Sequence, residues 1–147
     1  MDTTLLRQIS ILSIFFGLIL GLSTLIPYVN VISFIFLIFF VAPSVLWLLI
    51  KYNCITLDTT KGSIIVGALS GFISYMAFSV IYIPCSIILI KIFHITTNYG
   101  IAMILNNANL FLLIVISLFL GVFSATLNAF TGFLTYYVIE LLNSIKK

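Results

Sequence analysis

The side chains that carry most protein chemistry are scarce in this sequence. Its 147 residues hold three carboxylates, one histidine (His94) and two cysteines (Cys54 and Cys85) that show no CxxC spacing. A metal site usually needs three or four such ligands, and a nucleophile needs a base and an orienting group beside it. We therefore expect no enzyme activity, with no catalytic, metal-binding or cofactor-binding residues and no cofactor.

The remaining polar groups of interest lie within apolar sequence or beside it. Tyr75 and Asn128 are the deepest, and an unsatisfied amide or phenol in hydrocarbon costs roughly 2–7 kcal/mol. Hydrogen bonds between helices satisfy such groups, and the alternative is that Tyr75 and Asn128 line a polar path. Glu140 lies at the end of an apolar run, where its carboxylate reaches water. Residues 94–98 and 106–109 are uncharged but rich in donors and acceptors, so they are candidates for a polar mouth.

The composition of the chain indicates which kind of structural element carries these polar side chains. Hydrophobic residues make up 63% of the chain and charged residues 6%, against roughly 25% charged in a soluble domain. The apolar excess must therefore face lipid, which makes the bilayer the first partner. The net charge of +3 comes from cations that are scattered singly, so we expect no nucleic acid binding. The sequence predicts a single all-α transmembrane domain over residues 1–147.

Four apolar runs are long enough to cross a bilayer, which takes about 20 helical residues. They predict a bundle of four spans built as two hairpins, at residues 9–26, 31–50, 62–90 and 110–139. The third run exceeds the bilayer thickness, so it must tilt, protrude or bend near Pro84. Polar clusters interrupt residues 92–109, which we expect to form an interfacial or re-entrant segment on the outer side. Their inclusion in the last span is an alternative.

The basic residues predict the orientation of these spans. With four spans, five of the six cations fall on one side and only Lys91 falls on the other. Because Lys and Arg in short loops are retained on the cytoplasmic side, both termini should be cytoplasmic. The plasma membrane is the expected location. The five are Arg7, Lys51, Lys61, Lys146 and Lys147.

Small residues recur every four positions in three of the spans, a pattern that lets helix backbones approach closely in lipid. The candidate packing residues are Gly17 and Gly21 in the first span, Gly67 and Gly71 in the third, and Gly121 and Ala125 in the last. The same rows continue through Ser13, Ser63, Ser117 and Ala129, and Ser74 lies one step off the row of the third span. Such rows pack helices within one bundle or against another subunit or membrane protein.

Two functions from different classes fit this sequence. The first is a small structural or accessory membrane protein that packs with itself, as a homo-oligomer, or with a membrane partner through its small residues. The alternative is a minimal transporter or channel subunit for a small, mainly uncharged solute. A membrane-permeabilising protein of the holin kind also fits the size and the basic C-terminal end, by analogy alone.

Overall fold

The computed structural model describes residues 3–52, 54, 59–96 and 98–145. Every regular element in this part of the chain is an α-helix. The Asp58 carboxylate and the C-terminal cations Lys146 and Lys147 lie outside the described residues. The helices are α1 (Thr3–Ser23), α2 (Val29–Phe39), α3 (Val41–Lys51), α4 (Thr60–Lys91), α5 (Tyr99–Asn107) and α6 (Leu110–Ile145).

Three of these helices, α1, α4 and α6, are each long and apolar enough to cross a membrane. The pair α2 and α3 adds a fourth span if its two helices, bent by 61° at their junction, are one broken span. The predicted all-α fold with membrane-length helices is confirmed. Helices α1 and α6 extend past the predicted bounds into polar residues, because a helix can continue into water where its apolar run ends. Helix α4 continues through Pro84 without a break.

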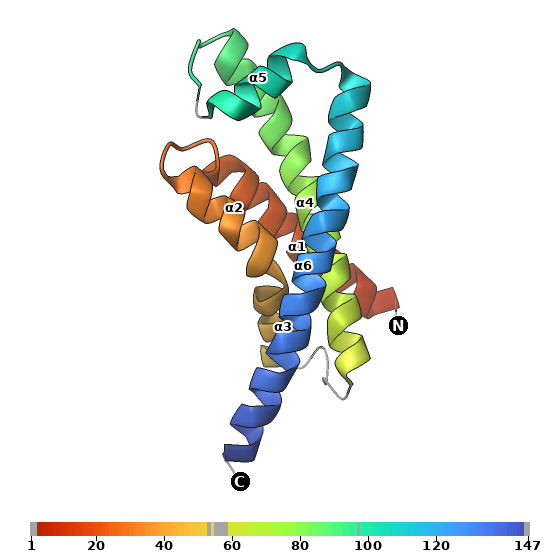
Figure 1. The fold of residues 1–147 in the computed structure, drawn as a ribbon. Helices are drawn as coiled ribbons and strands as arrows, with labels where there is room; N and C mark the ends of the chain where they lie inside the picture. Colours follow the sequence, from red (N-terminus) through yellow and green to blue (C-terminus); the bar gives the residue numbers. More distant parts are fainter. Residues whose placement is uncertain (1–2, 53, 55–58, 97, 146–147) are drawn as a thin grey trace.

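Helix α4 is the centre of the bundle. It makes its most extensive contacts with α6 and with α1, while α2 and α3 lie against the other helices from the side. Figure 1 shows the start of α1, the end of α3, the start of α4 and the end of α6 at one end of the molecule. The opposite end, here called the α5 end, holds α5 and the turn between α1 and α2. This arrangement gives two hairpins, α1 with α2–α3 and α4 with α6.

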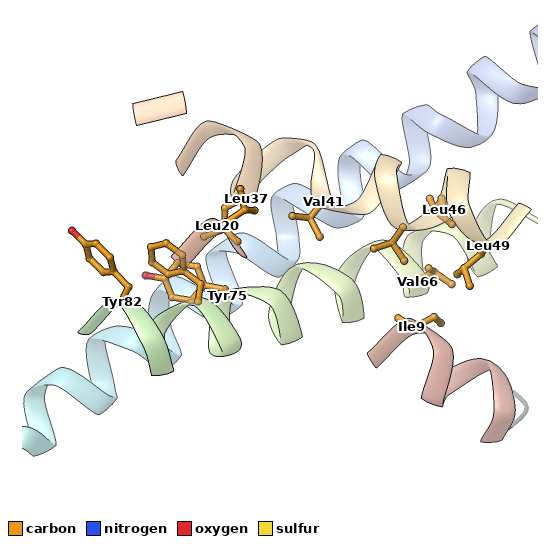
Figure 2. Close-up of a cluster of buried hydrophobic side chains, with 11 residues drawn as sticks. Ile9, Leu20, Leu37, Val41, Leu46, Leu49, Val66, Tyr75 and Tyr82 are labelled. Atoms are coloured by element: carbon orange, nitrogen blue, oxygen red, sulfur yellow. The ribbon is translucent and has the colours of Figure 1, made fainter. Parts of the chain in front are cut away.

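The apolar core lies between α1, α2, α3 and α4. Ile9 of α1 and Leu46 of α3 are buried near Val66 of α4, and Leu20 of α1 and Leu37 of α2 lie farther along the same cluster, near Tyr75 (Figure 2). Helix α6 differs, because its fully buried positions are small or polar and most of its large apolar side chains are exposed. Outward-facing leucines and phenylalanines suit contact with lipid, and the small face allows close approach to α4. The buried α6 residues are Gly121, Ser124, Asn128 and Gly132.

The second predicted span is broken at Phe40, which ends α2 with φ −110° and ψ −8°. Pro43 follows in the first turn of α3, where its missing N–H removes no helical hydrogen bond. Its fixed φ also favours the start of a helix. The proline is thus accommodated by starting a new helix instead of kinking one helix.

Residues 92–109 contain a separate short helix, α5, and not an extension of α6. The Asn98 side chain begins α5 by accepting hydrogen bonds from the N–H groups of Gly100, at 3.0 Å, and Ile101, at 3.3 Å. Ala108 ends α5 in an extended conformation, and Asn109 then accepts from Leu112 N at 2.8 Å in the first turn of α6. With nine residues α5 is too short to cross a bilayer. It lies across the α5 end instead (Figure 1).

Candidate binding cavity

The glycine pair of α1 packs on α4. A methyl group at Gly17 would meet the backbone oxygen of Ser74 and, at 2.8 Å, the Cβ of Ala77. One at Gly21 would lie 3.1 Å from the backbone oxygen of Phe78. Because backbone cannot move aside as a flexible side chain can, both positions need glycine for this approach of the two helices.

The glycine pair of α4 faces α6 instead. A methyl group at Gly67 would meet the backbone oxygen of Asn128, and one at Gly71 would lie 2.8 Å from that of Ser124. The row predicted on the third span is therefore divided between two neighbours, because Ser74 belongs to the contact with Gly17. A central helix must present one small face to each partner.

The structure centres the α6 contact with α4 on Ser124, Asn128 and Gly132. Ala125 is half-buried beside this row, while Gly121 is buried against the flexible end of Met76. Ser124 donates to the Gly71 carbonyl at 3.2 Å, and Ser63 donates to that of Gly132. Sequence analysis missed Ser124 and Gly132. The available signal was that both lie four residues from Asn128, on a row of small and polar residues.

Asn128 is fully buried and does not line a cavity. Its Oδ1 accepts from Ala42 N at 2.9 Å, and its Nδ2 donates to the carbonyl oxygens of Leu37 at 3.1 Å and Ile38 at 2.9 Å. These three backbone groups flank the break between α2 and α3. The amide therefore supplies hydrogen bonds that a continuous helix would make within itself. Asn128 is a bridge between helices, and of the two predicted path residues only Tyr75 borders open space.

Tyr75 lines a cavity of about 180 Å³ at the α5 end of the bundle. Phe78 and Tyr82 of α4 line it too, with ring centroids 5.7 Å apart for Tyr75 and Phe78 and 5.0 Å for Phe78 and Tyr82. Figure 2 shows Tyr75 and Tyr82 on α4, where seven residues, about two helical turns, separate them. Phe34 of α2 closes one side, 5.9 Å from Phe78 between ring centroids. These four aromatic rings line one part of the cavity, and isoleucine and leucine side chains line most of the rest.

The position of the cavity follows from the packing of α4 and α6. Where Gly67 and Gly71 lie, the two helices are in contact, and they diverge toward the α5 end (Figure 1). Helix α5 covers the widened end and contributes Ile101 and Leu105 to the lining. On the α6 side the lining includes Ile116 and Leu120. We call this space the aromatic cavity.

Two other hollows adjoin the aromatic cavity. A groove of about 650 Å³ lies between α4 and α6, and Ser79, Ile83, Leu113 and Ser117 line both it and the aromatic cavity. A mouth of about 260 Å³ lies at the turn between α1 and α2 and shares Phe34, Tyr82 and Ile101 with the cavity. Its polar lining comes from Thr24, Asn30 and Asn98.

The groups considered first for chemistry lie apart from these hollows. His94 and Glu140 are exposed, and Cys54 and Cys85 are free thiols. Among the described residues no group of three or more His, Cys, Asp or Glu side chains is placed to hold a metal ion. Comparison with protein-family models, with curated proteins and with solved structures finds no match for this chain.

Proposed function

We propose that this protein is a non-enzymatic, multi-pass membrane protein that binds a small, uncharged, mainly apolar molecule in the aromatic cavity. The observation that carries this proposal is the cavity itself, which is lined by residues of four helices and includes the aromatic rings of Phe34, Tyr75, Phe78 and Tyr82. Pockets that bind small molecules are typically concave, largely apolar and lined with aromatic residues, with a few polar groups to orient the ligand. Ser79 and Ser117 are such groups here.

The packing of the small residues favours this function over that of an accessory protein. The accessory hypothesis rests on small-residue rows that are free to meet another protein. Gly17, Gly21, Gly67 and Gly71 instead contact helices of the same chain. The outward face of α6 presents large side chains such as Phe119 and Phe130, which suit lipid.

The lining also determines the class of ligand. No charged side chain lines the aromatic cavity among the described residues, so an ion would lose its hydration without a partner. On the side away from α5, the contacts of Gly67 and Gly71 with α6 leave no room for a solute between these helices. A binding protein or carrier for an uncharged molecule therefore fits better than an open channel.

Photolabelling with a diazirine derivative of 1-octanol tests the proposal. The probe is uncharged, and its chain is small enough for the aromatic cavity. In protein reconstituted into phosphatidylcholine vesicles, we expect saturable labelling of peptides containing Tyr75 or Leu105, competed by unlabelled octanol and located by mass spectrometry. Ile116→Phe should fill part of the cavity and lower this saturable labelling roughly tenfold, equivalent to ~1.4 kcal/mol of binding.

The neighbouring position supplies a matched control. Val115→Phe introduces the same ring at an exposed position on α6 that does not line the cavity, so its labelling should equal that of the wild type. Labelling that rises linearly with probe concentration and is insensitive to Ile116→Phe would show partition into lipid only. That outcome would overturn the proposed function.

We also propose that the bilayer is the plasma membrane and that both termini are cytoplasmic. The basic residues support this orientation, because Arg7, Lys51 and Lys61 belong to the start of α1, the end of α3 and the start of α4, and Figure 1 shows these three helix ends away from α5. Lys51 lies over the exposed ring of Trp47, 4.8 Å from its centroid, a pairing typical of the membrane interface. Reporter fusions after residues 30, 98 and 147 are expected to report outside, outside and inside. A C-terminal fusion that reports the outside would contradict the assignment.

A further inference from the structure

We infer that the ligand is an uncharged amphiphile with a single hydrocarbon chain, which reaches the aromatic cavity sideways from the bilayer between α4 and α6 and places its polar head at the mouth. This inference rests on the proposed function and specifies its ligand and its route. It is based on three adjoining hollows, namely the groove, the aromatic cavity and the mouth. The linings of the groove and the aromatic cavity are mainly apolar, whereas the lining of the mouth includes polar side chains.

The groove supplies a surface for hydrocarbon. It lies between the diverging halves of α4 and α6, and apart from Ser79 and Ser117 its lining is apolar. Val80 and Ile114 form part of it from the two helices, and both are largely exposed, as expected at an opening to the membrane. A hydrocarbon chain already dissolved in the bilayer can enter such a groove without crossing water.

Only side chains separate the groove from the aromatic cavity. Ile83 and Leu113 line both spaces, and so do the small side chains of Ser79 and Ser117. The helices that carry these residues, α4 and α6, form walls of both hollows. Rotamer changes of Ile83 and Leu113 are therefore sufficient to join the two spaces, and these occur far faster than helix motions.

The mouth offers hydrogen bonds to a head group. The Oδ1 atoms of Asn30 and Asn98 accept from backbone N–H groups, which fixes both amides in place. In the part of the chain that the structure describes, neither Nδ2 atom donates a hydrogen bond. Thr24 donates to the Leu20 carbonyl at 2.6 Å, which leaves its oxygen able to accept. Hydroxyl and ester groups match this set of two donors and one acceptor.

We expect the head group to be uncharged, because a charged head would lose its hydration without meeting an opposite charge. Within the described residues no Lys, Arg, Asp or Glu lines the groove, the aromatic cavity or the mouth. A phosphate or a quaternary amine would therefore find no counter-charge at the mouth, whereas a glycerol or alcohol head needs none. A monoacylglycerol has this chemistry and serves as the probe.

The test uses a monoacylglycerol with a diazirine in mid-chain, in phosphatidylcholine vesicles that contain the full chain. We expect saturable labelling of groove residues near Pro84 and Leu113, competed by unlabelled monoacylglycerol. Val80→Trp combined with Ile114→Trp narrows the opening from both helices and should lower that labelling roughly tenfold. The control pair, Ile65→Trp with Val122→Trp, adds the same rings at exposed positions that line none of the three hollows and should change nothing.

A second variant tests the head-group contact. Asn30→Asp with Asn98→Asp keeps both capping oxygens but removes both amide donors, so it should weaken monoacylglycerol labelling by about threefold to tenfold, the worth of one or two hydrogen bonds. Labelling by a diazirine-bearing alkane without a head should stay unchanged. Saturable octanol labelling without saturable monoacylglycerol labelling would overturn this inference and leave the proposed function intact. Loss of both would overturn the two together.

Discussion

Replacing Asn128 by leucine is expected to lower the free energy of unfolding by about 2–4 kcal/mol. The substitution keeps the volume but removes hydrogen bonds to Ala42 N and to the carbonyl oxygens of Leu37 and Ile38. Each buried backbone group left without a partner costs ~1–3 kcal/mol, and interhelical hydrogen bonds in membranes fall at the lower end of that range. Thermal or denaturant unfolding in detergent measures the loss.

The matched control is Asn107→Leu. Asn107 is exposed and donates only to the Met103 carbonyl of its own helix, at 2.9 Å, so its loss should cost a few tenths of a kcal/mol. Should the two asparagine variants prove equally stable, the groups at the helix break would have to find other partners. The bridging role of Asn128 would then be wrong.

The double variant Gly67→Leu with Gly71→Leu is expected to destabilise the bundle by ~2–6 kcal/mol, since overpacking costs ~1–3 kcal/mol per site. Even a single methyl group at either position meets backbone or Asn128 atoms of α6, which no rotamer change on α4 can avoid. Leucine would force the two helices apart and break the contacts that Ser63 and Ser124 make across the same interface. A large fall in the thermal midpoint in detergent is the expected result.

Two controls separate close packing from a general effect of leucine. Ile64→Leu with Ile65→Leu changes exposed positions on the same helix and should leave the midpoint in place. Gly67→Ala should already destabilise, whereas Gly62→Ala should not, because a methyl group at Gly62 lies 3.4 Å from the Thr59 hydroxyl in ordinary contact. If the Gly67→Leu with Gly71→Leu variant were as stable as the Ile64→Leu with Ile65→Leu control, Gly67 and Gly71 would have to face lipid.

The sequence was sufficient to predict the fold class because the signal is large. Long apolar runs between isolated cations are typical of membrane-length helices, and the described residues contain three such helices, or four spans if α2 and α3 are one broken span. Among the small residues that the sequence pattern singled out, Gly17 and Gly67 each lie against another helix. Which neighbour each one meets was not predictable, because any face of an apolar helix can carry a small row.

The aromatic cavity and the break between α2 and α3 could not be predicted from the sequence, for a related reason. Phe40, where α2 ends, looks like its apolar neighbours, and Pro43 by itself is compatible with a kinked continuous helix. Tyr75, Phe34 and Leu105 come from three helices distant in sequence. They line a common cavity only because α4 and α6 diverge there. That divergence depends on the angle at which the two helices cross at Gly67 and Gly71.

The bridge at Asn128 also constrains the order in which the protein is completed. Ala42 and Asn128 are separated by 86 residues, and Asn128 lies on α6, which is synthesised after α2 and α3. While the ribosome is still producing the middle of the chain, the polar backbone at the interruption between α2 and α3 has no such partner in the membrane. We therefore expect the first hairpin to reach its final packing at this interruption only after α6 has been translated and supplies the Asn128 amide.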